Sequence, residues 1–334
     1  IGIENGNSET VNLSSLQGAT NISGLSDALV EDNSYYIGND PSSTTSTAER
    51  NLAVGGTALD AVTTGDDNVG VGYNALTANT TGPYNTALGS GTLQANTSGD
   101  GNTASGYQAL STNNTGRLNS GFGYRALYSN TSGEAAVAVG NSALYTNETG
   151  NHNSAVGYMS LYANTTGYGN TMVGFESGRS NTTGYYATAI GFEALESNTT
   201  GYGHTAIGYQ AMRTNTVGLY NTAVGFQAMY NTAAGSSEYN TAIGVQVLQA
   251  TASMYGTGLG FQALLSNTSG AGNTAVGHSA MRTNTTGQYN VAAGYSALYS
   301  NTTGEYNTAM GLSAMLRNTT GHNNVAIGRT ALEE

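Results

Sequence analysis

The sequence predicts an all-β fold, a β-solenoid or β-roll of 17 coils that repeat every 17 residues. A glycine closes a phrase resembling N-T-A-V-G seventeen times from Gly55 to Gly328, and fourteen of the sixteen intervals between these glycines are 17 residues. Each phrase alternates small and β-branched residues, as a short strand does, and is followed by an N-T-T-G turn signal. A low-complexity tract would not keep its period over this length, so we expect stacked, equivalent coils.

The repeat reads N-T-A-V-G-Y-Q-A-L-x-x-N-T-T-G-x-Y, and its positions are numbered 1 to 17 from the first Asn. Positions 1 to 6 are expected to form a strand, and positions 12 to 15 a turn in which Asn and Thr satisfy nearby backbone groups. Positions 6 to 11 fit a second short strand, which we favour, or one helical turn. Position 9 is Leu or Met except at Gly178, and position 3 is Ala or Gly except at Met172.

A single unit cannot bury a core. One Leu and one Val contribute roughly 3 to 5 kcal/mol when fully buried, whereas ordering the backbone costs roughly 1 to 2 kcal/mol per residue. The coils must therefore stack, with backbone hydrogen bonds between them, a Leu/Met ladder inside at position 9 and an Asn ladder at position 12. At about 4.8 Å per coil the rod would be on the order of 80 Å long.

The strand has one face of Thr, aliphatic and aromatic residues and another of only Ala and Gly. In the unit that begins at Asn290, we expect Val291, Ala293 and Leu298 in the core and Ala292 and Gly294 on a face of close approach. We expect this small-residue face to meet identical chains around a threefold axis, giving a homotrimer. The alternative is that it only fits inside a narrow single coil.

The composition excludes several classes of protein. Only 8% of the residues are charged and the formal net charge is −12, so the chain lacks the basic face that binds nucleic acid or anionic membranes. No apolar run has the length of a membrane span. There is no Cys, which removes disulfides and Cys-ligated metals.

Two regions are expected. Residues 1–50 are out of register with the repeat and are interpreted as an attachment or capping segment, with 41–47 as a linker; a fragment edge is the alternative. Residues 51–334 form the solenoid array, which stops in mid-unit, so the native chain is expected to continue. Coils near 226–260 are irregular, with core columns kept by Met229 and Leu248.

Catalytic chemistry is not expected, and neither are cofactors or metal sites. Glu193 and Glu196 are the nearest acidic pair in the array and are expected to be solvated. Asp60, Asp66 and Asp67 are interpreted as a charged turn. The four His fall at four different positions and make no ladder. The N-x-S/T sequons at position 12, as at Asn198 and Asn301, are interpreted as turn chemistry rather than glycosylation sites.

One variable column suggests recognition. Position 10 carries consecutive Tyr and Arg side chains that would form a stripe along the rod, able to bind a glycan or receptor by ring stacking. Contact between protomers or an ordinary surface is the alternative. The stripe comprises Tyr128, Tyr145, Tyr162, Arg179, Arg213 and Tyr230, with Glu196 between the two Arg.

The repeat resembles known families. The phrase A-V-G-F-Q-A, residues 223–228, is similar to the S-V-A-I-G-x-x-A-x-A repeat of trimeric autotransporter adhesin heads, which are left-handed trimeric β-rolls without the N-T-T-G segment. The array more closely resembles those of bacteriophage tail fibres and related virion appendage proteins, with runs like NTAVGYQALYSNTTG, and residues 25–55 resemble their lead-in segment. The resemblance implies a rigid homotrimeric fibre on a virion or outside a cell.

We therefore expect a structural shaft that presents a host-binding region. Its partners would be its own copies, virion or surface proteins at its ends, and a host glycan or protein. A bacterial surface adhesin is the alternative. An ice-binding or glycan-binding solenoid is a further one, although an ice-binding face shows Thr in alternation on a flat strand, whereas the Thr pair at positions 13 and 14 lies in a turn. A polysaccharide-degrading tailspike would need paired acids in a groove.

Overall fold

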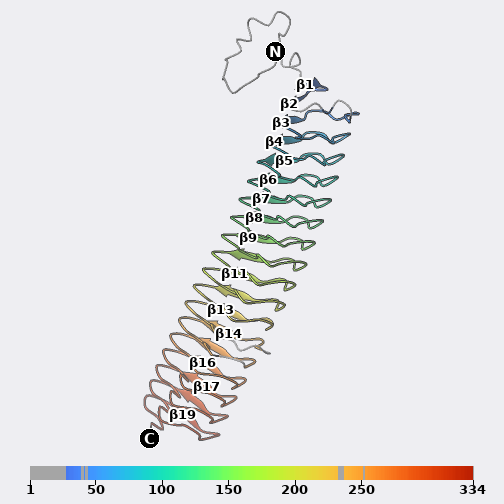
Figure 1. The fold of residues 1–334 in the computed structure, drawn as a ribbon. Coiled ribbons are helices and arrows are strands. Elements are labelled where there is room, and N and C mark those ends of the chain that lie inside the picture. Colours follow the sequence, from blue (N-terminus) through green and yellow to red (C-terminus); the bar gives the residue numbers. More distant parts are fainter. Residues whose placement is uncertain (1–27, 39–40, 42–43, 232–236, 251–252, 334) are drawn as a thin grey trace, which may run out of the picture.

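The chain forms a rod of stacked coils, seen in a computed structural model that describes residues 28–38, 41, 44–231, 237–250 and 253–333 (Figure 1). The described residues contain strands and turns but no helix. Eighteen strands, β2 to β19, are parallel, and within the regular array each residue pairs with the residue 17 positions later. The predicted β-solenoid with a 17-residue period is confirmed.

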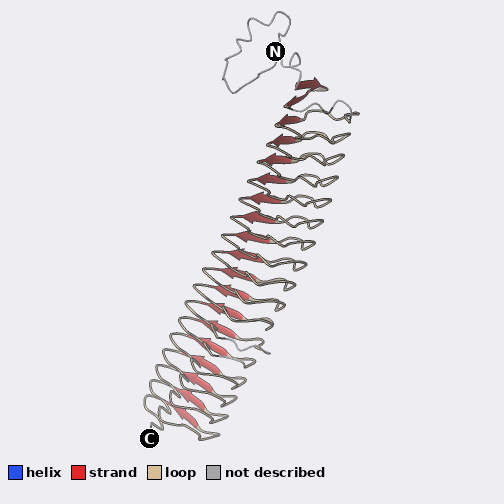
Figure 2. Cartoon of the chain, in the orientation of Figure 1, coloured by secondary structure: helices blue, strands red, loops and turns tan. Residues whose placement is uncertain are grey.

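The strands lie one above another along one side of the rod, and turns complete each coil (Figure 2). The bounds are β1 Ala28–Glu31, β2 Ser34–Ile37, β3 Leu52–Val54, β4 Val69–Val71, β5 Thr86–Leu88, β6 Thr103–Ser105, β7 Ser120–Phe122, β8 Val137–Val139, β9 Ser154–Val156, β10 Thr171–Val173, β11 Thr188–Ile190, β12 Thr205–Ile207, β13 Thr222–Val224, β14 Thr241–Ile243, β15 Thr257–Leu259, β16 Thr274–Val276, β17 Val291–Ala293, β18 Thr308–Met310 and β19 Val325–Ile327.

The middle of each repeat is a run of turns, so the favoured second strand is wrong. Positions 7 and 9 have left-handed backbone angles, as at Gln108 (φ 54°) and Leu110 (φ 52°), and position 17 has them as well. A non-Gly residue in this region costs roughly 1–2 kcal/mol, so the surrounding contacts must enforce it. Left-handed residues at positions 7 and 9 thus flank a residue with negative φ at position 8, such as Ala109. This alternation turns the chain back, and positions 7 to 14 form a second layer beneath the strand.

The core lies between these two layers and is thin. Positions 3, 8 and 9 fill it, and Ala292, Ala297 and Leu298 are fully buried. Val291 is 40% exposed, so its predicted place in the core is wrong, and Ala293 is only partly buried. The small residues face inward because the second layer approaches the strand too closely for larger side chains. The expectation that Ala292 faces identical chains is therefore also wrong, and the narrow-coil alternative holds.

Two columns of Asn close most of the coils. The Nδ2 of Asn96, at position 12, donates to Oδ1 of Asn79 one coil earlier (2.8 Å) and to the carbonyl of Gly99 (3.0 Å). The Nδ2 of Asn85, at position 1, donates to the same carbonyl (2.9 Å), and its backbone N–H donates to Oδ1 of Asn68 (2.9 Å). The predicted ladder at position 12 is confirmed, and position 1 adds a second one.

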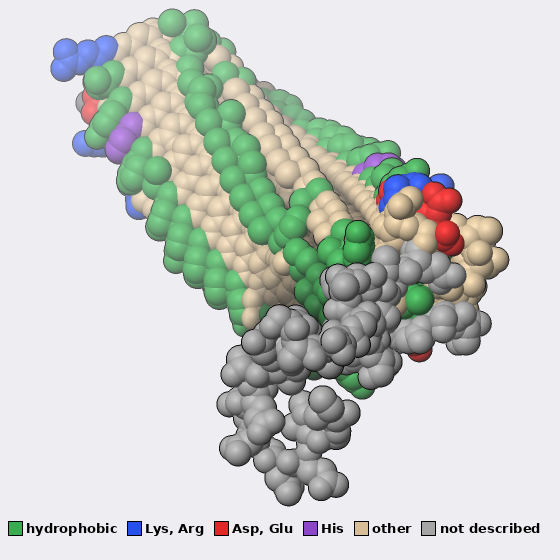
Figure 3. All heavy atoms as spheres, turned by 90° about the horizontal axis from the view of Figure 1, so that it is seen from above, with side chains coloured by type: hydrophobic (Ala, Val, Ile, Leu, Met, Phe, Trp, Pro, Cys, Tyr) green, Lys and Arg blue, Asp and Glu red, His purple; other side chains and the backbone are tan. Residues whose placement is uncertain are grey.

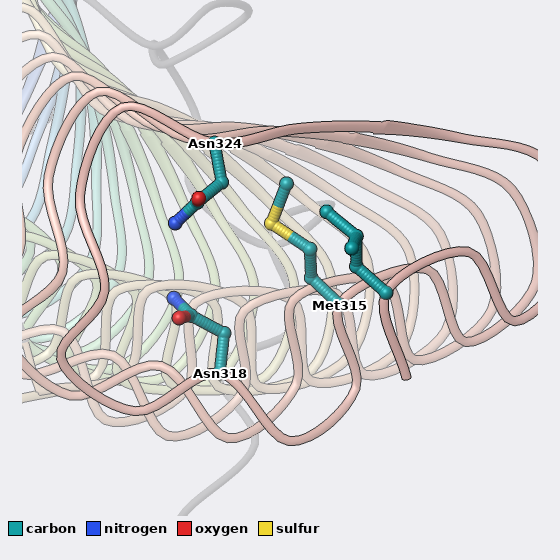
Figure 4. A pocket seen from close by; sticks show the side chains of 4 residues that line it. Met315, Asn318 and Asn324 are labelled. Atoms are coloured by element: carbon teal, nitrogen blue, oxygen red, sulfur yellow. The ribbon is translucent and has the colours of Figure 1, made fainter. Parts of the chain in front are cut away.

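The last described coil shows this arrangement end-on (Figure 4). Asn324, from the strand layer, and Asn318, from the second layer, point toward one another beside Met315. The Nδ2 of Asn318 donates to the carbonyl of Gly321 (3.3 Å). An added Cβ on Gly321 would lie 2.3 Å from Oδ1 of Asn318, so the close approach at position 15 of this coil leaves no room for a side chain.

In the coil that contains β10, the small and the large core residue have exchanged positions. Met172 occupies position 3 and is fully buried, while Gly178 occupies position 9. A Cβ added at Gly178 would lie 2.7 Å from Sδ of Met172. The two exceptions in the sequence therefore compensate each other, because the large side chain comes from the strand layer instead of the second layer.

The stack of parallel strands begins before residue 51. β2 pairs in parallel with β3, and β1 pairs antiparallel with β2. Ser46 and Thr47 donate backbone N–H groups to the carbonyl of Thr63 (3.0 and 3.1 Å), so this part of the expected linker stacks on the first coil. The remainder of the expected attachment segment, residues 1–27, lies outside the described residues.

The irregular coils keep their core but lose part of the Asn ladder. Met229 and Leu248 are fully buried, as expected. No Asn at position 12 continues the ladder between Asn215 and Asn267 among the described residues, and Oδ1 of Asn215 has no hydrogen-bond partner there. Ser253 takes the place of the position-15 glycine, and its Oγ accepts from Nδ2 of Asn267 (2.9 Å).

The exchanged core pair gives a double-mutant test. Met172→Ala alone leaves a cavity and should destabilise the protein by about 2–5 kcal/mol, and Gly178→Leu alone should clash with Met172. The double variant restores the common Ala/Leu arrangement, so it should be less destabilised than the sum of the singles by about 1–3 kcal/mol. Urea unfolding followed by circular dichroism measures this. Additive effects would contradict the compensation.

Candidate binding surfaces

The side chains at positions 2, 4 and 6 point outward and form the surface that we call the strand face. Position 4 is mostly aliphatic and position 6 mostly aromatic; Ile190 is 40% exposed and Phe192 41% exposed. Arg329, in the last coil, is the one charged residue at these positions throughout the array. Figure 3 shows hydrophobic side chains in long rows that run parallel to the rod. The strand face is therefore regular and free of charge over nearly its whole length, with two largely apolar rows beside a row of mostly Thr.

Aromatic rings stack along the position-6 row. Adjacent ring centroids are 5.0–5.4 Å apart in the row formed by Tyr158, Phe175, Phe192, Tyr209 and Phe226. His278 continues such a row between Phe261 (4.9 Å) and Tyr295 (4.8 Å). The rings cover one another's faces and leave their edges to solvent.

The predicted position-10 stripe exists as one row with two different parts. Tyr128, Tyr145 and Tyr162 stack with centroids 5.1 and 5.2 Å apart. The Nη1 of Arg213 donates to Oη of Tyr230 (3.0 Å), farther along the rod. Because the stacked rings cover one another's faces, a ligand would meet mainly ring edges and hydroxyl groups there, rather than the open faces that ring stacking requires.

Arginine side chains bind the acidic pair, which is not freely solvated. The side chains of Glu193 and Glu196 are only 15% exposed, and the Nε of Arg213 lies 2.7 and 2.8 Å from their carboxylates. Arg179 lies 3.3 Å from Glu176 and 3.9 Å from Glu196. The two carboxylates share a cation, which suits a structural ion-pair network better than acid–base catalysis.

A further group of tyrosines lies at positions 16 and 17, just before the strands, in the middle of the array. Tyr168, Tyr185 and Tyr202 stack with centroids 5.0 and 4.5 Å apart. Tyr186 is 63% exposed and meets Tyr168 edge-on. The repeat's Y at position 17 was visible in the sequence, but its exposure depends on a bend that the pattern did not indicate.

Other candidate groups have structural partners. Arg50 contacts both Asp66 (3.5 Å) and Asp67 (2.7 Å), and its hydrogen bond holds the pKa of the Asp67 carboxyl below its usual value. The sequon side chains of Asn198 and Asn301 are buried within the Asn ladder, with Nδ2 donating at 2.7 Å to the preceding coil. In the described part of the chain, no three His, Asp or Glu side chains gather as metal ligands would.

His204 replaces an Asn in the position-1 column. It is almost fully buried, and its Nδ1 accepts from the backbone N–H of Asn221 (3.3 Å). Burial lowers the pKa of the imidazole to about 4. The histidine is therefore a neutral member of the ladder at pH 7, a role that its position in the repeat could have indicated.

The fold places the chain in the class of parallel β-solenoids. No family model, curated protein or solved structure matches the chain in comparisons with each. No helix in the described part of the chain has the length and apolar character that a membrane span requires.

The buried His204 predicts a specific pH dependence. The unfolded chain takes up its proton near pH 6.5 and the folded chain only near pH 4, so folding stability falls as the pH is lowered through this window. From pH 7 to pH 4 the wild type should lose about 3 kcal/mol more stability than His204→Asn. Urea unfolding at both pH values measures this.

The exposed His152 provides the control for that experiment. His152→Asn should keep the pH dependence of the wild type. The assignment fails if His204→Asn and His152→Asn respond to pH in the same way.

Proposed function

We propose that the chain is a shaft segment of a multichain fibre, most consistent with a bacteriophage tail fibre or another virion appendage. The rod carries the proposal, since every described coil repeats one structural unit and adds length. Its role is mechanical, holding a host-binding region and other virion proteins at its ends, outside a cell or on a virion. A bacterial surface adhesin would use the same shape.

Assembly from three copies is part of this proposal. A single coil is only two thin layers thick, and it has no disulfide to stiffen it. The small-residue face does not support the trimer, because those residues lie inside the coil. Support comes instead from the resemblance of the repeat to fibre arrays and from the apolar strand face, which a lone chain leaves in water.

Catalysis is not part of the proposed role. A polysaccharide-degrading spike would require paired carboxylates free to transfer protons, whereas Glu193 and Glu196 share Arg213.

Ice binding is a second candidate, favoured by one observation. The Thr row at position 2 lies on the regular strand, next to the aliphatic row at position 4. The Thr row at position 2 is distinct from the Thr pair at positions 13 and 14, which lies in a turn. It forms part of a flat face on which successive coils are about 4.8 Å apart. Thermal hysteresis at millimolar protein would support it, and no hysteresis would exclude it.

The fibre proposal predicts the native mass. Light scattering after size exclusion should give about 102 kDa, three times the chain mass of 34.0 kDa. Electron microscopy should show straight particles on the order of 80 Å long or more. A mass of 34 kDa with no dependence on concentration would contradict the assembled shaft.

A further inference from the structure

We infer that further copies of this chain cover the strand face, with coils at equal heights side by side. The inference rests on the proposed fibre and identifies the surface on which its chains meet. It replaces the small-residue face, which the structure places in the core.

The first argument is exposed area. Twenty-four large hydrophobic side chains at positions 4 and 6 are each at least about one-third exposed. Together they present on the order of 1,500 Å² of apolar surface, whereas the largest apolar patch on an ordinary monomer is about 300–600 Å². A standard stable interface covers about 800 Å² on each partner. The face therefore has enough apolar area for a permanent interface.

The second argument is charge. Each chain carries a formal net charge of −12, which opposes association of identical chains. Acidic and basic residues of the array occupy positions such as 7, 10 and 16, as at Glu176, Arg179 and Arg117, and leave the strand face neutral up to Arg329. Two copies can approach on this face without bringing like charges together.

The third argument is periodicity. The face extends over all 17 coils, so a compact globular partner would cover only part of it. A second copy has the same spacing between its rungs, and cyclic symmetry with the axis along the rod places equivalent coils at the same height. Each aliphatic or aromatic side chain then meets an equivalent neighbour along the whole length.

The lack of native cysteine makes the contact directly testable. The single variants Thr188→Cys, Ile190→Cys and Phe192→Cys place a thiol at position 2, 4 or 6 of one coil. The variant Thr200→Cys places a thiol at the exposed turn of the same coil. After mild oxidation, at least one strand-face variant should form interchain disulfides, which require Cα atoms about 4.4–6.8 Å apart. Maleimide should label the strand-face thiols at least tenfold more slowly than Cys at position 200.

A charge test complements the cross-linking. Ile190→Arg/Ile207→Arg should shift the native mass toward 34.0 kDa, while Thr183→Arg/Thr200→Arg, with the same added charge at exposed turns, should leave the assembly intact. Circular dichroism confirms that both remain folded.

The outcomes separate this inference from the fibre proposal. If the wild type is assembled but strand-face thiols label as fast as the turn thiol and do not cross-link, the inference is wrong and the fibre proposal stands. If the wild type is a monomer, both fail.

Discussion

Two columns of buried Asn side chains join successive coils, and the closure and register of the coils depend on them; in eight coils an Asn from each column donates to the same glycine carbonyl. In the coil of Gly99, Asn96 and Asn85 donate from opposite layers to the same oxygen. Both also bind the coil before through Oδ1 of Asn79 and Asn68, so one set of amides closes the coil and holds it in register with its neighbour. Because these amides are buried, losing a partner would leave an unsatisfied group, which costs about 1–3 kcal/mol.

The closed corner brings the two layers together and thereby decides which face of the strand is inside. Small residues, mostly Ala, and one large side chain per coil, usually Leu or Met, fit the gap, so Ala206 and Met212 are buried while Ile207 and Tyr209 are partly exposed. The inner volume is conserved even where the residues change: Val247 takes position 8 where Gly258 takes position 3 of the next coil, and a Cβ on Gly258 would lie 2.4 Å from Val247. The larger side chains are left outside, which is why a single chain presents an apolar face.

Much of this architecture was predictable from the period. The coil count, the turn, the Leu/Met column and the Asn ladder at position 12 follow from which residues recur. The orientation of the strand did not, because burying the larger side chains is the usual expectation. It depends on left-handed residues at positions 7 and 9, and a Leu such as Leu110 gives no sign that its φ is positive. The Tyr and Arg of position 10 were correctly placed in one row, but their stacking and ion pairs depend on side-chain orientation, which the spacing does not specify.

The buried amide ladder can be observed directly by hydrogen exchange in protein labelled with ¹⁵N-Asn. The Nδ2 protons of ladder residues such as Asn113 and Asn130, which donate at 2.7 Å to the preceding coil, should exchange at least a hundredfold more slowly than those of the exposed Asn141 and Asn231. Exchange of the ladder amides at the rate of the exposed ones would contradict the account.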